Sequence, residues 1–196
     1  MKKIIGLLIL LAGSVSCLIH ATNSTSSGNL DIGDYYQGGV IYWLDSAKAN
    51  KHGLIVDIND APHSSGYAWD TSPPSKTQAL DDKVYTGKNN TQLIISAIGS
   101  ARAQAAYACV SSTSQGYSDW YLPSKYELEL LLEKQIIITK AASARGGHMV
   151  GHHPYWSSTE YGRNSSLNLT LSYGGSVHTT TYKKNQTLSV RCVRAF

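Results

Sequence analysis

The cysteines of this chain, taken together with its N-terminus, constrain the fold more than any other feature. The chain has three cysteines, Cys17, Cys109 and Cys192. Its first residues, MKKIIGLLILLAGSVSC, place two lysines before an apolar run from Ile4 to Ala12 and then small residues. This is the pattern of a secretory signal peptide. Because Cys17 belongs to the signal or to a lipid anchor, an even pair of cysteines is left in an oxidising compartment, where disulfides persist.

We therefore predict a disulfide between Cys109 and Cys192, which lie 83 residues apart (192 − 109). A cross-link across a loop of this length stabilises a fold by about 2–4 kcal/mol. The alternative is a pair of buried free thiols. The predicted bond ties the C-terminal sequence LSVRCVRAF to a segment in the middle of the chain.

The N-terminal processing divides the chain into three parts. Cleavage after Ala21 removes a signal peptide at 1–21 and leaves a leader at 22–33 that is rich in Ser, Thr, Asn and Gly, which we expect to be flexible. A single domain follows at 34–196. The alternative is a lipoprotein, because SVSC resembles a lipoprotein processing site with Cys17 as the lipidated residue. We expect a secreted or cell-surface protein, or in the alternative an outer-membrane lipoprotein.

Composition and charge narrow the class of ligand. The formal net charge of +4 includes two lysines of the signal peptide, so the remaining bias is too weak to indicate nucleic acid. The chain has 13 Tyr and 4 Trp but one Phe. Tyr and Trp suit half-exposed positions on a surface that binds a polar ligand, although small secreted β-rich domains also have this composition.

Hydrophobic periodicity predicts an α+β domain in which the disulfide joins the end of a helix to the last strand. The capping box Ser124–Glu127 marks the start of one helix, and Gly174–Gly175 marks a turn. We place the last strand centrally in the sheet. The expected elements are strands at 38–45 and 52–60, a loop at 61–90, a helix at 89–109, a second helix at 124–135, a hairpin at 166–182 and a final strand at 187–194.

Six motifs in order resemble one known family. GGVIYWLD, HGLIV, Cys109, DWYLPSKYELELL, YWSSTEY and LSVRCVRAF are similar to the motif series of the Lcl C-terminal domain family of bacterial surface proteins, over residues 36–196. One departure is Tyr121, where the family usually has arginine. The resemblance implies a C-type-lectin-like fold, with a twisted antiparallel sheet, two flanking helices and long loops. It also implies a non-enzymatic adhesin role with sulfated glycosaminoglycans as ligands.

Sulfated sugars are bound by cations with suitable donor geometry, and the second half of the chain supplies such residues. If the loop at 141–165 folds over the sheet, these residues form one basic patch beside Tyr155 and Tyr161. The alternative is a set of scattered, solvated charges. The candidate glycan-binding residues are Arg145, His148, His152, His153, Arg163, His178, Lys183 and Lys184.

The sequence predicts no metal site and no cofactor. Calcium takes about 6–8 oxygen ligands, and the lectin motifs E-P-N, Q-P-D and W-N-D are absent. Asp57, Asn59 and Asp60 offer oxygens close together, but a solvated turn accounts for them. His148 and His152 have the spacing of helical zinc motifs, but the glycines around them argue against a helix.

We expect a non-enzymatic adhesion module that binds anionic or sulfated glycans or a host surface. No G-x-S-x-G, H-E-x-x-H or glycine-rich phosphate loop indicates catalysis. The alternative is a protein-interaction or envelope-structural module on the same fold without affinity for glycans. We expect no nucleic-acid partner, and membrane contact only through a possible lipid anchor at Cys17; a homo-oligomer is compatible with the sequence.

Overall fold

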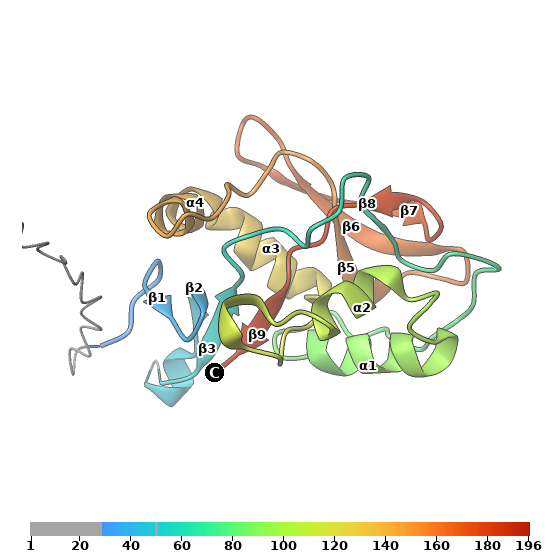
Figure 1. The fold of residues 1–196 in the computed structure, drawn as a ribbon, viewed down its shortest axis with the longest axis horizontal. Coiled ribbons are helices and arrows are strands. Elements are labelled where there is room, and N and C mark those ends of the chain that lie inside the picture. Colours follow the sequence, from blue (N-terminus) through green and yellow to red (C-terminus); the bar gives the residue numbers. More distant parts are fainter. Residues whose placement is uncertain (1–28, 50) are drawn as a thin grey trace, which may run out of the picture.

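The computed structural model describes residues 29–49 and 51–196, which form an α+β arrangement of four α-helices and antiparallel strands (Figure 1). The signal peptide, most of the predicted leader and the possible lipidation site Cys17 lie outside these residues. The strands are β1 (Tyr35–Tyr36), β2 (Gly39–Leu44), β3 (Gly53–Val56), β4 (Tyr67–Ala68), β5 (Tyr155–Glu160), β6 (Ser165–Leu171), β7 (Val177–Lys183), β8 (Thr187–Leu188) and β9 (Val193–Ala195). The helices are α1 (Gly87–Ile98), α2 (Gln104–Val110), α3 (Lys125–Glu133) and α4 (Gln135–Ser143), with short 3-10 turns at Ser46–Lys48 and Ser114–Gly116.

Both ends of the domain lie in one sheet, whose strand order is β1-β2-β3-β9. A second sheet has the order β5-β6-β7, and β4 pairs with β8. The prediction that the last strand is central is wrong, because β9 is an edge strand. On its other side its backbone pairs with Tyr121, which exchanges hydrogen bonds of 2.8 and 3.0 Å with Val193. The loop before α3 therefore closes this edge of the sheet.

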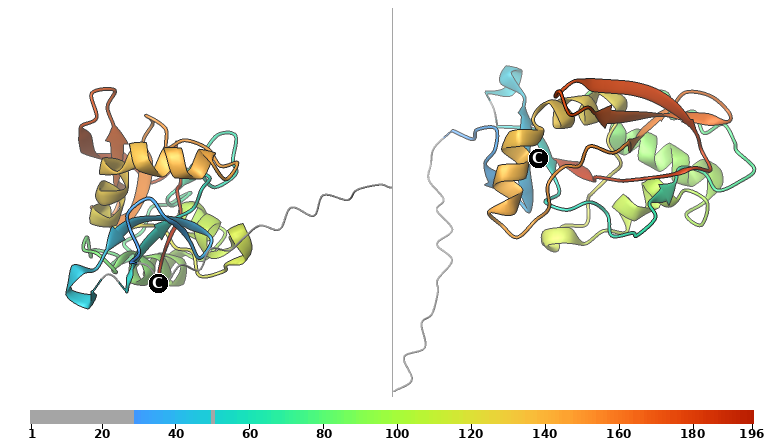
Figure 2. Two further views of the ribbon diagram at one scale, coloured as in Figure 1. Left: turned by 90° about the vertical axis from the view of Figure 1, so that its left-hand side faces the viewer. Right: turned by 90° about the horizontal axis from the view of Figure 1, so that it is seen from above.

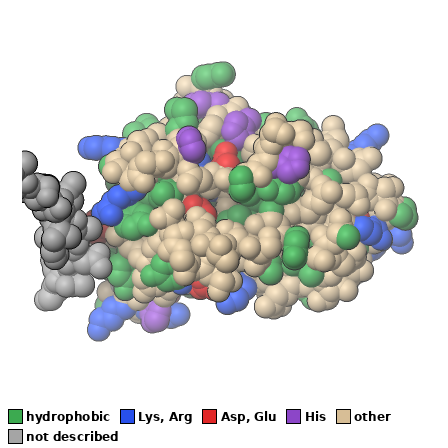
Figure 3. All heavy atoms as spheres, viewed as in Figure 1, with side chains coloured by type: hydrophobic (Ala, Val, Ile, Leu, Met, Phe, Trp, Pro, Cys, Tyr) green, Lys and Arg blue, Asp and Glu red, His purple; other side chains and the backbone are tan. Residues whose placement is uncertain are grey.

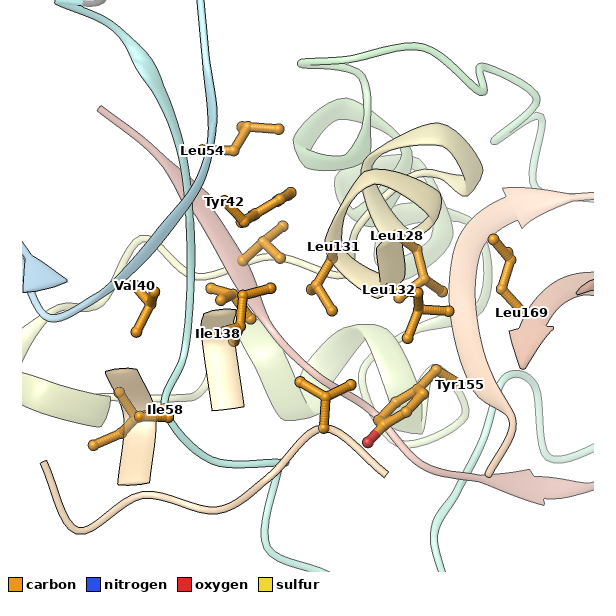
Figure 4. Packing of buried hydrophobic residues seen from close by; sticks show 14 of the residues in the cluster. Val40, Tyr42, Leu54, Ile58, Leu128, Leu131, Leu132, Ile138, Tyr155 and Leu169 are labelled. Carbon is orange, nitrogen blue, oxygen red and sulfur yellow. The ribbon is translucent and has the colours of Figure 1, made fainter. Parts of the chain in front are cut away.

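The first sheet separates two hydrophobic clusters, because its successive side chains point to opposite faces. Val40 and Tyr42 of β2 enter one cluster and Ile41 enters the other. The leucine cluster lies under α3, α4 and β6 (Figure 4). The tryptophan cluster lies under α1 and α2. The leucine cluster contains Leu54, Leu128, Leu131, Leu132, Leu169 and Leu171, and the tryptophan cluster contains Trp69, Trp120, Trp156, Cys109 and Cys192.

The structure has four helices where the sequence predicts two. The helix predicted at 89–109 is interrupted at Gly99, which has a positive φ of 74° and ends α1. The helix predicted at 124–135 corresponds to α3, which ends before Lys134, whose φ of −98° and ψ of 12° leave the helical region. α4 was not predicted, and the segment predicted as a loop at 141–165 contains the end of α4 and the strand β5. The start of α3 is as predicted, because the side chains of Ser124 and Glu127 form a capping box. Among the described residues, none of these helices is long and apolar enough to cross a membrane.

The predicted disulfide is confirmed. Cys109 and Cys192 are joined with an S–S distance of 2.06 Å and a Cα–Cα distance of 5.4 Å. The bond joins α2 to the segment between β8 and β9. The single strand predicted at 187–194 is therefore observed as two short strands with Cys192 between them. The predicted leader ends earlier than residue 33, because Leu30 and Ile32 pack against the tryptophan cluster.

Candidate functional site

A groove of about 1120 Å³ opens beside the disulfide, with Cys192 among its lining residues. One wall is the segment that follows β3, and the other is α2 with the residues after it. On the face drawn in Figure 3, acidic side chains lie in the middle and histidines lie along the upper part. The polar and aromatic lining residues are Asp57, Asn59, Asp60, His63 and Tyr67 from the first wall, Gln104, Tyr107 and Ser111–Ser114 from the second, and His148 from a third segment.

The segment Val190–Cys192 holds both walls of the groove. The Asp57 amide donates to the Cys192 carbonyl at 3.0 Å, and the Ala61 amide donates to the Val190 carbonyl at 2.8 Å. These bonds attach the first wall. The disulfide to Cys109 attaches α2, the second wall, to the same segment. The cross-link therefore sets the distance between two walls that are remote in the sequence.

A buried arginine organises the polar end of the groove. The Arg191 side chain has no exposed surface, and its Nε lies 2.6 Å from Asp60 Oδ1. Its Nη1 donates to the Asp57 carbonyl and its Nη2 to the Met149 carbonyl, both at 3.0 Å. The other Asp60 oxygen accepts from the Tyr155 hydroxyl at 3.1 Å and stays partly exposed. The ion pair therefore presents a carboxylate in a fixed orientation to the groove.

Asp57 supplies a second, more enclosed carboxyl group. Burial raises its pKa, and hydrogen bonds from the Ser114 side chain and the Asn59 amide, together with Arg191, oppose that rise. The Asn59 amide lies 3.1 Å from Asp57 Oδ1. Asp57 thus links the two walls, because it starts the first wall and contacts Ser114 of the second. The groove offers fixed hydrogen-bond acceptors rather than a concentration of positive charge.

The order of the six sequence motifs fits a family-level match. A family model described as the Lcl C-terminal domain matches residues 42–194, most of the chain. The chain belongs to the Lcl C-terminal domain family. The resemblance seen in the six sequence motifs is thereby confirmed. No curated protein matches this chain.

The Lcl C-terminal domain of this chain is similar in fold to a protein of known structure. That structure is a crystal structure of a fimbrial protein from Bacteroides ovatus ATCC 8483, with a TM-score of 0.64 and 16% sequence identity. The match covers 84% of this chain and 48% of the fimbrial protein, so the chain spans about half of that protein's length. At this identity the likeness concerns the fold alone.

Three of the predicted glycan-binding residues lie in one segment of the Lcl C-terminal domain near the groove. His148 Nδ1 lies 2.7 Å from Asn59 Oδ1, and His153 Nε2 lies 3.8 Å from Asp60 Oδ2. The ring of His152 stacks on Tyr173, with 4.7 Å between centroids. Each histidine therefore contacts a neighbouring side chain, and His148 itself lines the groove.

The structure does not gather the other candidates into the predicted basic patch. Arg145 lies over the ring of Tyr35, 4.4 Å from its centroid, beside the first sheet. Arg163 and Lys183 lie together at one end of the β6–β7 hairpin, since Lys183 faces Ser165 in the ladder. His178 lies toward the opposite end of β7, facing Thr170. The eight residues therefore do not form one patch.

Lys184 is misplaced in the sequence prediction, because it is a buried structural residue. Its side chain has no exposed surface, and its Nζ lies 2.5 Å from Glu160 Oε1 and 2.6 Å from the Ser75 carbonyl. The same ammonium lies 4.4 Å from the centroid of a Trp69 ring. Burial lowers the pKa of Lys184, and Glu160 opposes that effect. Lys184 cannot contribute to an exposed glycan-binding patch.

Sequence reasoning missed most of the groove. Asp57, Asn59 and Asp60 were visible as a polar cluster, but the other wall was not, because Tyr107 and Ser111–Ser114 carry no motif. The one indication in the sequence was that these residues lie next to Cys109. Because the disulfide holds Cys109 beside Cys192, the residues next to Cys109 lie near the C-terminal segment as well. Within the described ranges, no three His, Cys, Asp or Glu side chains are placed to hold a metal ion.

Proposed function

We propose that this domain is a non-enzymatic adhesion module of the bacterial surface that binds a glycan in the groove beside the disulfide. The observation that carries the proposal is the combination of an open groove of about 1120 Å³, fixed carboxyl and amide groups, and tyrosines in its walls. Binding sites for small molecules are concave and combine apolar surface with a few oriented polar groups. This groove has both parts.

The lining suits a ligand rich in hydroxyl groups. Carboxylates and amide oxygens accept hydrogen bonds from hydroxyls, and the partly exposed Asp60 carboxylate and the Gln104 side chain provide such acceptors. Tyr67 and Tyr107 offer aromatic surface with a polar tip, against which the apolar face of a sugar ring packs. Because Arg191 is paired with Asp60, its charge is already neutralised. The groove therefore favours a neutral glycan over a polysulfated one.

A second candidate is an anionic glycan at the end of the β6–β7 hairpin. Arg163 and Lys183 are exposed there, and no carboxylate among the described residues forms an ion pair with either. Exposed guanidinium and ammonium groups are the donors that sulfate groups require. Two cations give a weak, strongly salt-dependent site, so this candidate ranks below the groove.

We also infer that the domain follows the C-type-lectin-like plan implied by the family resemblance, and that it works outside the cytoplasm. In support, the first strands and the last strand share a sheet, and long loops carry the groove. The Cys109–Cys192 bond suits an oxidising compartment. The adhesin role rests on the family and on the site, because one fold hosts many functions.

The test is a glycan array followed by calorimetry with the best ligand, using a matched pair of tyrosine variants. Tyr107 in the groove and Tyr126 on α3 are each 46% exposed. We expect Tyr107→Ala to weaken binding by about tenfold or more, since a stacked aromatic residue contributes about 1–3 kcal/mol. Tyr126→Ala should bind as the unmodified protein does. Equal loss in both variants would place the ligand elsewhere.

The same experiment separates the alternatives. The hairpin site is favoured if heparin binds and its binding falls steeply with salt. Binding should then be lost in the double variant Arg163→Ala/Lys183→Ala and kept in the control Lys88→Ala/Lys140→Ala. All four of these side chains are exposed. A blank array with no salt-sensitive retention on heparin favours the protein-interaction or envelope-structural role.

A further inference from the structure

β7 is a long edge strand, and no other strand in the described part of the chain pairs with its outer edge. It is the last strand of the sheet β5-β6-β7, and six of its seven residues are exposed. Both panels of Figure 2 show it on the outside of the molecule. An edge strand presents unpaired backbone N–H and C=O groups and so is a template for another strand. The direction of these groups decides whether β7 can act as one.

The printed hydrogen bonds at the two ends of the β6–β7 hairpin fix that direction. Near the turn, the Ser172 amide donates to the Ser176 carbonyl at 2.9 Å. At the other end, the Lys184 amide donates to the Asn164 carbonyl at 3.0 Å. Residues that exchange bonds alternate with residues whose amides point away. Counting in steps of two from either end gives the same result: the even-numbered residues of β7 bond to β6.

The odd-numbered residues of β7 therefore turn their amides and carbonyls outward. Lys183 agrees with this phase, because its amide donates to the Gln186 side chain at 3.2 Å instead of to β6. Val177, Thr179 and Thr181 are the remaining outward residues. Within residues 29–49 and 51–196, none of their amides has a hydrogen-bond partner outside the sheet. They form a continuous row of free donors and acceptors.

Other edges in the described chain are short or occupied. β1 has two residues. At the outer edge of β9, Val193 is bonded both ways to Tyr121. On the free side of β5, the Trp156 amide donates to the Ser189 carbonyl, and the Ser189 amide donates to the Pro154 carbonyl. Edge strands that stay unpaired usually carry a proline, a bulge or inward charges. The sequence VHTTTY at 177–182 has none of these.

We propose that β7 pairs antiparallel with β7 of a second copy of this chain, about a two-fold axis at Thr179. In this register Thr179 faces its own copy and Val177 faces Thr181, so these three outward residues meet outward residues, while Lys183 lies beyond the paired stretch. Threonine and β-branched pairs across strands are favourable. The only charge of β7, Lys183, lies at opposite ends of the two strands, so no like charges face each other. The strand is therefore complementary to itself, which favours a second copy over an unrelated peptide.

One strand pair is a small interface. Stable complexes bury about 1,200–2,000 Å² in total, and a single pair of short strands buries less. The dimer is therefore expected to form reversibly, at micromolar concentrations or above. The groove residues belong to other elements, so both grooves stay open in the dimer. Two sites in one particle raise the avidity for a surface that displays many copies of a ligand.

The test is sedimentation velocity of the full chain over a concentration series, with variants at Thr179. Thr179→Pro removes an outward amide and leaves the β6–β7 bonds intact, and proline is tolerated at an edge where the amide faces solvent. It removes two backbone bonds per dimer, so we expect the dimer dissociation constant to rise about thirtyfold. Thr179→Val keeps the amide and should dimerise as before.

Thr179→Lys serves if the proline variant does not fold, because it sets two like charges opposite each other at the axis. It should also abolish the dimer, and near-ultraviolet circular dichroism checks that the fold is kept. A protein that is monomeric up to about 1 mM overturns the proposal. So does a dimer that persists in both the Thr179→Pro and the Thr179→Lys variants. Neither result bears on glycan binding by the monomer.

Discussion

The leucine cluster and the tryptophan cluster lie on opposite faces of one sheet but are closed in different ways. On the leucine side, α3 begins at a complete capping box. Its buried face packs Leu128, Leu131 and Leu132 into the cluster on the sheet. On the tryptophan side the cover is α1, the seven-residue α2 and long loops. The first face is stabilised mainly by apolar burial. The second combines the twelve-residue α1 with a short helix and loops, and specific bonds hold these loops.

Several of those bonds hold loop segments on the tryptophan side. Besides the disulfide, the Trp69 indole donates to the Ser157 carbonyl at 2.9 Å, and the Trp156 indole donates to the Tyr67 carbonyl at 2.7 Å. A buried Asp70 pairs with Arg102 at 2.9 Å. Loops held by such bonds have defined positions without belonging to a helix or a sheet. They can therefore form the walls of a groove. The leucine face supplies the rigid support and the tryptophan face supplies the site.

The largest expected effect comes from breaking the buried pair Lys184–Glu160. Lys184→Met leaves the Glu160 carboxylate buried without its partner, which costs about 3–5 kcal/mol in the free energy of unfolding. Glu160 also accepts from the Thr77 and Gln78 amides, so the loop that carries them should loosen. Urea unfolding followed by tryptophan fluorescence measures the loss.

The adjacent lysine is the matched control for this variant. Lys183 is exposed at the end of β7, and Lys183→Met should change the free energy of unfolding by no more than about 0.5 kcal/mol. The contrast between two neighbouring lysines tests whether the tryptophan side depends on specific buried bonds. Similar losses in the two variants would contradict that description.

A smaller loss is expected from removing the cross-link. The double variant Cys109→Ser/Cys192→Ser should lower the free energy of unfolding by about 2–4 kcal/mol. Hydrogen exchange should show where the effect acts: amides of α2 lose protection, while those of α3 keep theirs relative to global unfolding. Equal loss of protection in both helices would mean that the two faces are not independently closed.

The comparison also explains what the sequence could predict. The capping box at Ser124 and the Cys109–Cys192 pair follow from local rules and from compartment chemistry, and both are confirmed. The break at Gly99 was missed, because a glycine within a periodic run does not show whether the helix continues. Arg102 three residues later turns toward Asp70, a contact that only the tertiary fold provides.

The site was less predictable than the fold for the same reason. Lysines are rarely buried, so Lys184 appeared to be a surface cation beside Lys183. Its burial depends on Glu160 and on the Ser75 carbonyl, which are remote in the sequence. The histidines of the loop around His148 do approach the groove, but Arg163 and Lys183 do not. Local patterns give the direction of side chains on regular elements, and they do not give the course of long loops.

The smallest expected effect tests Glu127, a carboxyl group that is buried on the leucine side. Burial raises the pKa of Glu127 from 4.5 to about 7, although hydrogen bonds from the Ser124 and Tyr85 amides and the Tyr121 hydroxyl oppose this. Between these two values the folded state holds a proton that the unfolded state releases. The free energy of unfolding should therefore rise as the pH falls from about 8 to about 5, by about 2 kcal/mol from this group.

The Glu127→Gln variant cannot ionise at this position and keeps a side chain of the same shape. The quantity to compare between the variant and the unmodified protein is the pH dependence of the unfolding free energy, and not its absolute value. We expect the difference in unfolding free energy between the unmodified protein and the variant to shift in favour of the unmodified protein as the pH falls. Urea titrations at three pH values measure it. A constant difference would show that Glu127 stays ionised in the folded state, held by the capping-box hydrogen bonds. In that case the leucine face would also rest on a specific polar contact, and the contrast between the two faces would be weaker than their composition indicates.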